Sequence, residues 1–186
     1  TNEVVNGDIH TANMRAAGLT DRDQAKTFIY AFLYGAGPAK IGKVVGGGAL
    51  AGQRLISKFL RSMPKLKELR ENVVEASQTG TIKALDGRLL HIRADYASLN
   101  TLLQGAGAII CKQWLVHITE RIHKSGVDAK LVASIHDEYQ FEVAKKDATK
   151  FGQITKDAMK ETEKTLNIKC PLDCEFKIGT TWSETH

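Results

Sequence analysis

Cysteine is scarce in this sequence of 186 residues, and its scarcity limits what can hold the chain together. The three cysteines, Cys111, Cys170 and Cys174, are odd in number and too few for a disulfide framework. Three residues separate Cys170 from Cys174, which is not a common zinc-ligand spacing, and no histidine is close to them in the sequence. The cysteines are therefore expected to be buried thiols of a protein in a reducing compartment.

Long hydrophobic runs are also absent. No apolar stretch approaches the roughly 18 residues that a membrane-spanning helix needs, and the first ten residues are polar. The sequence therefore predicts neither a transmembrane span nor a signal peptide. It begins at Thr1 and not at methionine, which favours a processed or excised piece of a longer chain.

The composition is otherwise ordinary for a globular protein. Hydrophobic residues make up 42% and charged residues 25% of a chain long enough for one large domain or two small ones. The net charge of +5 and the pI near 9.1 are compatible with an anionic partner, although many proteins without one are as basic. The glycine run 46–48 lacks the Lys-Ser/Thr ending of a phosphate-binding P-loop and is expected to be a connector.

The stretch 22–35, RDQAKTFIYAFLYG, has the strongest pattern in the sequence. On a helix, two cations and two phenols recur every fourth residue along one broad stripe, at Arg22, Lys26, Tyr30 and Tyr34. The opposite side is apolar, with Ala25, Phe28, Ile29 and Phe32. The stripe spans roughly 18 Å at about 1.5 Å per residue, enough for a triphosphate and a flat aromatic group. A solvated face with half-buried tyrosines would give the same pattern.

The other segments predict an α+β fold in which antiparallel hairpins pack on helices. Amphipathic helices are expected at 12–17, 49–61, from Pro64 onward, at 96–124 and at 147–166. Asp86-Gly87 between 81–85 and 89–93 is a strong hairpin signal, and 130–135 with 139–143 form a second pair of strands. A final strand is expected at 173–179.

Polar groups on these later elements suit a nucleic-acid partner. Arg88, His91 and Arg93 make the first hairpin basic, which fits phosphate contacts or a solvated edge equally well. Asn100 and Gln104 lie one turn apart, where amides could meet base edges in a minor groove or simply flank a core helix.

The turn of the second hairpin is unusual because it lacks glycine and asparagine. It presents His136, Asp137 and Glu138 instead. Carboxylates gathered at a strand tip are what Mg²⁺ requires, whereas a solvated acidic turn is the structural alternative.

Taken together, these motifs resemble those of family A DNA polymerases, which include bacterial DNA polymerase I and the replicative polymerases of tailed phages. The stripe that runs from Arg22 to Tyr34 and Gly35 resembles the fingers-helix motif of that family. The sequence SIHDE at 134–138 resembles the palm hairpin motif, and Asn100-x3-Gln104 resembles the motif between them. Their order and spacing agree over essentially the whole chain, and DIHT at 8–11 indicates the phage branch.

The resemblance implies a nucleotide site on the fingers helix. Arg22, Lys26 and His10 would bind the phosphates of the incoming nucleotide. Tyr30 would pack against the sugar and base, where its hydroxyl favours chain-terminating sugars. Lys26 also belongs to the implied catalytic set.

The resemblance also implies a metal site and a duplex site. Asp137 and Glu138 would bind catalytic Mg²⁺ and complete the catalytic set. Tyr34 would stack at the template position. The implied primer-template contacts are Tyr34, Gly35, Arg88, Asn100, Gln104 and His136. One departure is Tyr96, where the family commonly has an arginine, so a duplex contact there is not expected.

Two-metal phosphoryl transfer needs carboxylates from two places. The family takes its first aspartate from an upstream D-x-S-x-x-E-x-R strand, and this sequence contains no such stretch. The expected subdomains are therefore the fingers at 1–78 and the C-terminal part of the palm at 79–186.

The hypothesis is a C-terminal piece of a DNA polymerase, inactive alone and located in the cytoplasm, that of the host cell if a phage encodes it. Its expected partners are primer-template DNA, deoxynucleoside triphosphates and an N-terminal segment with the remaining palm and thumb, but no membrane. The alternatives are a non-catalytic module that binds nucleic acid or nucleotides, and a fragment of a related single-subunit RNA polymerase.

Overall fold

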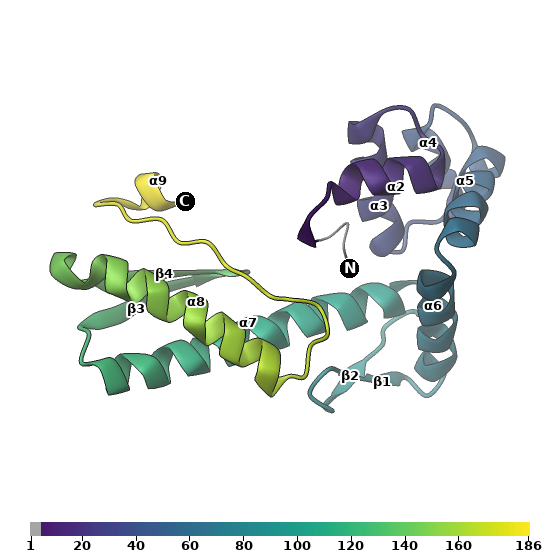
Figure 1. The fold of residues 1–186 in the computed structure, drawn as a ribbon. Helices are drawn as coiled ribbons and strands as arrows, with labels where there is room; N and C mark the ends of the chain where they lie inside the picture. The colour runs from purple at the N-terminus through teal and green to yellow at the C-terminus, as the bar shows by residue number, and fades with distance from the viewer. Residues whose placement is uncertain (1–4) are drawn as a thin grey trace. The chain divides into compact units, whose positions relative to one another are not determined.

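The chain packs as two compact units, Thr1–Gly105 and Ala106–His186, each with its own core (Figure 1). The structure is a computed structural model that describes residues 5–186, so the start of the chain at Thr1 lies outside the described residues. Helix α7 (Ser98–Ser125) begins in the first unit and ends in the second. The expected fingers and palm subdomains, divided between residues 78 and 79, are functional divisions and stay a prediction.

Within residues 5–105 the structure describes a series of short helices, whose starts follow from local sequence. They are α2 (Ile9–Ala17), α3 (Arg22–Leu33), α4 (Pro38–Val44), α5 (Ala49–Ser62) and α6 (Pro64–Ser77). The side chains of Asp8 and Asp21 cap α2 and α3 by accepting hydrogen bonds from backbone amides. Pro38 and Pro64 begin α4 and α6, where a missing backbone N–H costs nothing.

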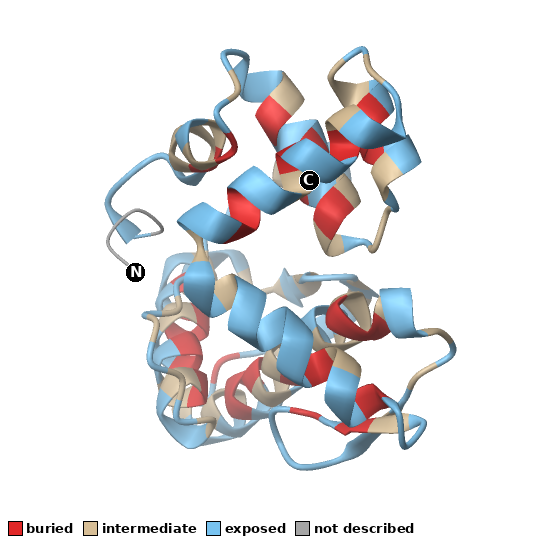
Figure 2. Ribbon diagram, turned by 90° about the vertical axis from the view of Figure 1, so that its right-hand side faces the viewer, coloured by how far each residue is buried: buried red, intermediate tan, exposed pale blue. Residues whose placement is uncertain are grey.

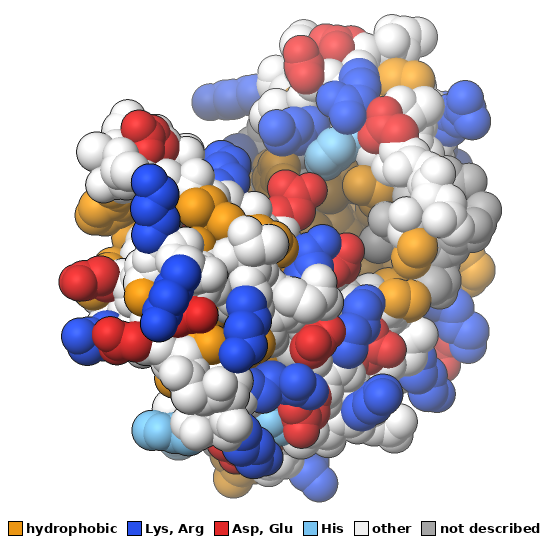
Figure 3. All heavy atoms as spheres, turned by 60° about the vertical axis from the view of Figure 1, so that its left-hand side comes forward, with side chains coloured by type: hydrophobic (Ala, Val, Ile, Leu, Met, Phe, Trp, Pro, Cys, Tyr) orange, Lys and Arg blue, Asp and Glu red, His pale blue; other side chains and the backbone are white. Residues whose placement is uncertain are grey.

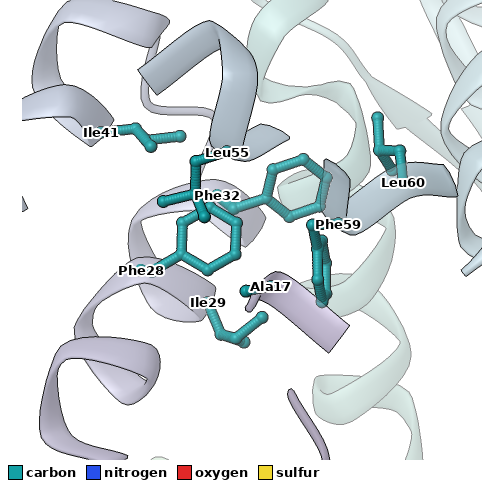
Figure 4. Close-up of a cluster of buried hydrophobic side chains, with 8 residues drawn as sticks. All are labelled: Ala17, Phe28, Ile29, Phe32, Ile41, Leu55, Phe59 and Leu60. Atoms are coloured by element: carbon teal, nitrogen blue, oxygen red, sulfur yellow. The ribbon is translucent and has the colours of Figure 1, made fainter. Parts of the chain in front are cut away.

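The core of this unit is an aromatic cluster between α3 and α5 (Figure 4). Phe59 meets Phe28 and Phe32 edge-on, with ring centroids 5.2 and 5.6 Å apart. Figure 2 shows the buried residues of these helices on their inward sides. The cluster comprises Ala17, Phe28, Ile29, Phe32, Ile41, Leu55, Phe59 and Leu60. The predicted apolar face of α3 is thus confirmed, since its members Ala25, Phe28, Ile29 and Phe32 are all buried.

The first predicted hairpin is confirmed, with shorter strands than expected. Strands β1 (Thr81–Lys83) and β2 (Leu89–His91) pair antiparallel, with Thr81 opposite His91. A short 3₁₀ turn, η1 (Asp95–Ala97), then leads into α7. The long helix therefore starts two residues later than the pattern indicated, at Ser98.

The second unit folds around the C-terminal part of α7. Strands β3 (Ala129–Ile135) and β4 (Glu138–Val143) form the second predicted hairpin, with Ile135 opposite Glu138 next to the turn. A 3₁₀ turn, η2 (Lys145–Asp147), leads to α8 (Ala148–Thr165), and α9 (Trp182–Thr185) closes the chain. Trp114 of α7 donates a 2.8 Å hydrogen bond to the carbonyl of Thr155 of α8. The core consists of Trp114, Ile118, Val127, Phe151, Ile154, Ala158 and Met159.

The strand expected at 173–179 is wrong. This segment has neither helix nor strand structure, because no strand within residues 5–186 pairs with it. The preceding backbone is held by side chains of α8 instead: Leu172 donates its N–H to Glu163 at 2.8 Å and accepts from Lys160. Cys174 packs against the second core. An alternating pattern alone is therefore not sufficient for a strand here.

The remaining expectations concern the fold class, the cysteine thiols and membrane-spanning helices. The α+β class, with hairpins packed on helices, is confirmed. Cys111, Cys170 and Cys174 are free and half-buried. Among the described helices, none is both long enough and apolar enough to cross a membrane.

The contact between α4 and α5 gives a first prediction. A Cβ on Gly52 would lie 1.9 Å from the carbonyl oxygen of Pro38 and 2.7 Å from the amide nitrogen of Gly42. Both are backbone atoms, so Gly52→Ala must push the helices apart, and we expect a loss of roughly 1–3 kcal/mol of unfolding free energy. Gly48→Ala is the matched control, because nothing lies within 4 Å of that position. Equal denaturant midpoints for the two variants would contradict the close approach.

Candidate active site

The exposed stripe of α3 presents its cations and phenols as the sequence predicted. Arg22, Lys26, Tyr30 and Tyr34 are all exposed, and Tyr30 and Tyr34 keep 47% and 54% of their surface. Large aromatic side chains so exposed are costly unless something covers them in use. The stripe is therefore a candidate binding surface and not the packed side of the helix.

Arg22 is not a free cation, because Asp8 holds its guanidinium. Its Nε and Nη2 donate to the two carboxylate oxygens of Asp8 at 2.9 and 3.2 Å. Thr11 donates to the same carboxylate at 2.7 Å. The hydrogen bond from Arg22, followed by that from Thr11, holds the pKa of Asp8 well below its usual range, and Asp8 raises the pKa of Arg22. Lys26, by contrast, forms no ion pair within residues 5–186.

His10 lies beside Tyr30, which brings two of the predicted nucleotide contacts together. Their ring centroids are 6.5 Å apart at an interplanar angle of 51°. The Nδ1 atom of His10 is buried and has no hydrogen-bond partner within the described part of the chain. A polar atom left in this state suits a ligand that supplies a hydrogen bond.

Tyr34 and Gln104, two of the predicted template and primer contacts, also meet. The Nε2 of Gln104 donates to the hydroxyl of Tyr34 at 3.3 Å across 70 positions of sequence. Next to them, Gly35 has φ +79°, and a Cβ there would lie 2.2 Å from the carbonyl oxygen of Tyr96. The backbone conformation at the end of α3 thus requires glycine at position 35, independently of any contact with the template strand.

Arg88 and Asn100 take no part in that hydrogen bond. Arg88 is exposed and bridges Asp86 in its own hairpin, with Nη2 2.6 Å from the Asp86 carboxylate. This contact lowers the pKa of Asp86. Asn100 is half-buried near the start of α7. The face drawn in Figure 3 shows Lys and Arg interspersed with Asp and Glu, so the net charge of +5 gives no unbroken basic surface there.

In the turn of the second hairpin, the side chains of His136 and Asp137 are exposed to solvent. His136 has φ +54°, a conformation that non-glycine residues seldom adopt and that is often retained where function requires it. Asp137 is exposed and accepts no hydrogen bond from the described residues. Asp137 also lies near α7, because its charge adds to burial in raising the pKa of the Cys111 thiol.

Glu138 differs from Asp137 because it already has partners. Gln140 donates to its carboxylate, and Nδ1 of the C-terminal His186 lies 3.1 Å from Oε2. These contacts, Gln140 first, lower the pKa of Glu138. Thr185 donates to Gln140 at 3.1 Å, so the last two residues of the chain are anchored beside the turn. Sequence reasoning missed this contact, since 48 positions separate His186 from Glu138 and no local pattern joins them.

The donor set at the turn fits a hard cation such as Mg²⁺. Asp137 offers free carboxylate oxygens at an exposed tip, and those of Glu138 lie at the adjoining residue. The described residues place no group of three His, Cys, Asp or Glu ligands at this turn. The structure therefore supplies part of a metal site here, with Asp137 as the accessible ligand.

Comparison with known proteins resolves the family. The family model for DNA polymerase family A matches residues 4–184, which is nearly the whole chain. The chain belongs to DNA polymerase family A. The resemblance seen in the sequence motifs is thus confirmed.

The phage branch of the family is confirmed by relatives. The chain is 43% identical to the DNA-directed DNA polymerase of Enterobacteria phage T3 and 41% identical to that of Escherichia phage T7. Each alignment covers 99% of this chain but only 29% of the phage protein. The identity to DNA polymerase I of Bacillus caldotenax is lower, 25% over 96% of the chain and 21% of that protein.

The fold also matches a solved polymerase structure. The POL domain of Pol1 from M. smegmatis, in complex with DNA primer-template and dNTP, superposes with a TM-score of 0.75. The match has 20% sequence identity and covers 91% of this chain and 32% of that one. At this identity the likeness concerns the fold alone.

The ion pair between Asp8 and Arg22 gives a second prediction. The pKa of Asp8 is lower in the folded state than in the unfolded chain, where it is about 3.9. The ion pair therefore gives its full stabilisation above that pH. The stabilisation is lost as the pH falls from there through the folded-state pKa. We expect the Asp8 carboxyl carbon, followed by NMR, to show no titration between about pH 3 and 5.

Arg22→Ala is the companion variant in that experiment. Without the guanidinium, the pKa of Asp8 is expected to rise toward its ordinary range, so that the carboxyl signal titrates in the same window. Identical titration curves for the two proteins would show that the pair does not form in solution.

Proposed function

We propose that this chain forms the fingers and the C-terminal part of the palm of a DNA-directed DNA polymerase. The reaction is template-directed transfer of a deoxynucleotide to a primer 3′ end. The observation that carries the proposal is the conjunction of the exposed α3 stripe and the Asp137 turn in a chain 43% identical to a phage DNA polymerase. Because the chain spans 29% of that relative, the rest of the polymerase comes from a segment outside these 186 residues.

The α3 stripe binds the incoming deoxynucleoside triphosphate in this proposal. Lys26 supplies an unpaired cation for the phosphates, and Arg22 joins it when its guanidinium exchanges the Asp8 carboxylate for phosphate oxygens. His10 offers its unpartnered Nδ1 next to Tyr30, whose exposed ring packs on the sugar and base. Lys26 also stabilises charge on the leaving pyrophosphate, which makes it a catalytic group.

Asp137 is the metal ligand that this chain contributes. Mg²⁺ held by Asp137 would supply positive charge that offsets the charge developing on the reacting phosphate. Glu138 lies beside this ligand, with its carboxylate held by Gln140 and His186. A second carboxylate, from the segment outside the chain, completes the site. His136 is placed next to Asp137 to meet the primer terminus.

The proposed contacts with the primer-template duplex begin with Tyr34 and Gln104. Tyr34 occupies the template position, and the hydrogen bond from Gln104 holds its ring until the templating base replaces it. Gln104 and the neighbouring Asn100 then reach the minor groove of the primer-template, where amides read the acceptors common to all base pairs. Arg88 contacts the phosphate backbone, and Gly35 allows the close turn beneath Tyr34. The proposed location is the cytoplasm of the host cell.

Primer extension tests the proposed function. We expect no extension by the 186-residue chain alone with Mg²⁺ and four deoxynucleotides, and extension once the complementary N-terminal segment is added. Asp137→Asn in the joined enzyme should reduce extension by at least about 10³-fold, because a neutral amide holds Mg²⁺ poorly. Glu142→Gln, an exposed change on the strand that follows the turn, is the control. Full activity of the Asp137 variant would favour a non-catalytic binding module.

The same primer-extension mixture distinguishes a DNA polymerase from a single-subunit RNA polymerase. A DNA polymerase incorporates deoxynucleotides much faster than ribonucleotides under these conditions. Equal rates with the two sugars would favour the single-subunit RNA polymerase instead.

Nucleotide binding tests the role of Lys26 separately. Lys26→Ala removes a cation from the α3 stripe, and we expect the affinity of the joined enzyme for a deoxynucleoside triphosphate to fall about tenfold or more. Lys40→Ala on α4 is the matched control, since Lys40 is also an exposed lysine of the first unit. Fluorescence titration measures both, and equal affinities would remove Lys26 from the site.

A further inference from the structure

A histidine and two glutamates meet between α7 and α8, at residues the polymerase mechanism does not use. His117 and Glu120 lie one turn apart on α7, and Glu161 comes from α8, which packs alongside α7 (Figure 1). The Nδ1 of His117 is 3.5 Å from Oε2 of Glu120 and 3.8 Å from Oε1 of Glu161. One ligand atom from each residue lies within 4.8 Å of the others.

The imidazole of His117 is buried, and only one of its two ring nitrogens has hydrogen-bond partners among the described residues. Its side chain keeps only 9% of its surface, and Nδ1 has no hydrogen-bond partner among the described residues. The other nitrogen, Nε2, lies 3.1 Å from the hydroxyl of Thr165 and 3.1 Å from the side-chain amide of Gln113. The two contacts at Nε2 leave Nδ1 directed at the carboxylates of Glu120 and Glu161.

This arrangement leaves negative charge at the cluster that a cation would offset. Arg121 donates to Oε2 of Glu161 at 3.0 Å and so neutralises that carboxylate in part. The second oxygen of Glu161 is the one that faces His117, and Glu120 has no cationic partner other than His117 in the described structure. A proton or a metal cation on Nδ1 would offset the charge of the two carboxylates, and a bound metal would take the place of the proton.

The spacing of the three donors suits a metal of the zinc class. Tetrahedral coordination with bonds of about 2.0–2.1 Å places neighbouring nitrogen and oxygen ligands roughly 3.3–3.4 Å apart. The observed 3.5 and 3.8 Å need only small side-chain movements to reach that geometry. Imidazole nitrogen with carboxylate oxygen favours Zn²⁺ over Mg²⁺, which prefers oxygen ligands alone.

Arg121 and Thr165 have the positions of outer-shell groups. Arg121 orients the Glu161 carboxylate, and Thr165 lies 3.1 Å from Nε2 and helps to hold the imidazole ring in place. The side chains of Glu120 and Glu161 are 51% and 40% exposed, so the fourth coordination position opens to solvent. Ion entry therefore needs no rearrangement of the helices.

We propose that His117, Glu120 and Glu161 bind a single divalent transition-metal ion of the Zn²⁺ type. The ion joins α7 to α8 and stabilises the second unit, because it binds the folded arrangement and not the unfolded chain. The proposal is independent of the polymerase function, since its ligands are separate from Asp137 and Glu138. It also needs no catalytic step.

Isothermal titration of Zn²⁺ into the 186-residue chain tests the proposal, with Asp137→Asn as the background so that the hairpin turn does not compete. We expect one binding event per chain and a rise in unfolding midpoint as Zn²⁺ is added. His117→Gln and Glu120→Gln should each weaken binding by at least about tenfold and diminish that rise. His123→Gln is the matched control, because His123 is an exposed histidine of the same helix.

Two further measurements test the proposal if the His117→Gln variant does not fold. Glu120 is half exposed, so Glu120→Gln should preserve the fold and still lose affinity. The ¹⁵N signals of the His117 ring should shift at Nδ1 on titration with Zn²⁺. An imidazolium that already carries a proton on Nδ1 and ignores Zn²⁺ would overturn the proposal, as would unchanged affinity in Glu120→Gln.

Discussion

The edge-to-face packing of Phe59 against Phe28 and Phe32 fixes the rotation of α3 about its own axis. A helix with one apolar side has one favourable orientation toward a core, so burying these rings forces the opposite stripe outward. Arg22 and Lys26 are thereby exposed, and Lys26 needs no ion pair within the described residues to place it there. The proposed nucleotide surface is thus a consequence of the core, and a change that rotated α3 would move every group on it at once.

The charged groups of the proposed active site are mostly held by other parts of the chain. Arg22 is held by Asp8, and Glu138 is held by Gln140 and the terminal His186. Such charge-assisted contacts keep the groups oriented while no ligand is bound, and they must be exchanged when phosphates or metal arrive. Lys26 and Asp137 have no such partner among the described residues, so they are the groups ready to bind first.

Much of the fold could be predicted because its signals are local. The two-sided pattern of α3, the Asp86-Gly87 turn and the prolines that begin α4 and α6 each act within a few residues. The strand expected at 173–179 failed for the opposite reason. Alternating side chains suit a strand, but pairing needs a neighbour, and no strand among the described residues pairs with this segment.

The sequence by itself determined which chemical groups the protein carries, in what order, and on which side of each helix or turn they lie. Only the tertiary structure decided which groups meet: Arg22 with Asp8, Tyr34 with Gln104, Glu138 with His186, and His117 with Glu161. The physical reason is that hydrogen bonding in helices and turns depends on neighbours along the chain. Contacts across 14 to 70 positions depend instead on how the buried faces pack, and no spacing in the sequence encodes that.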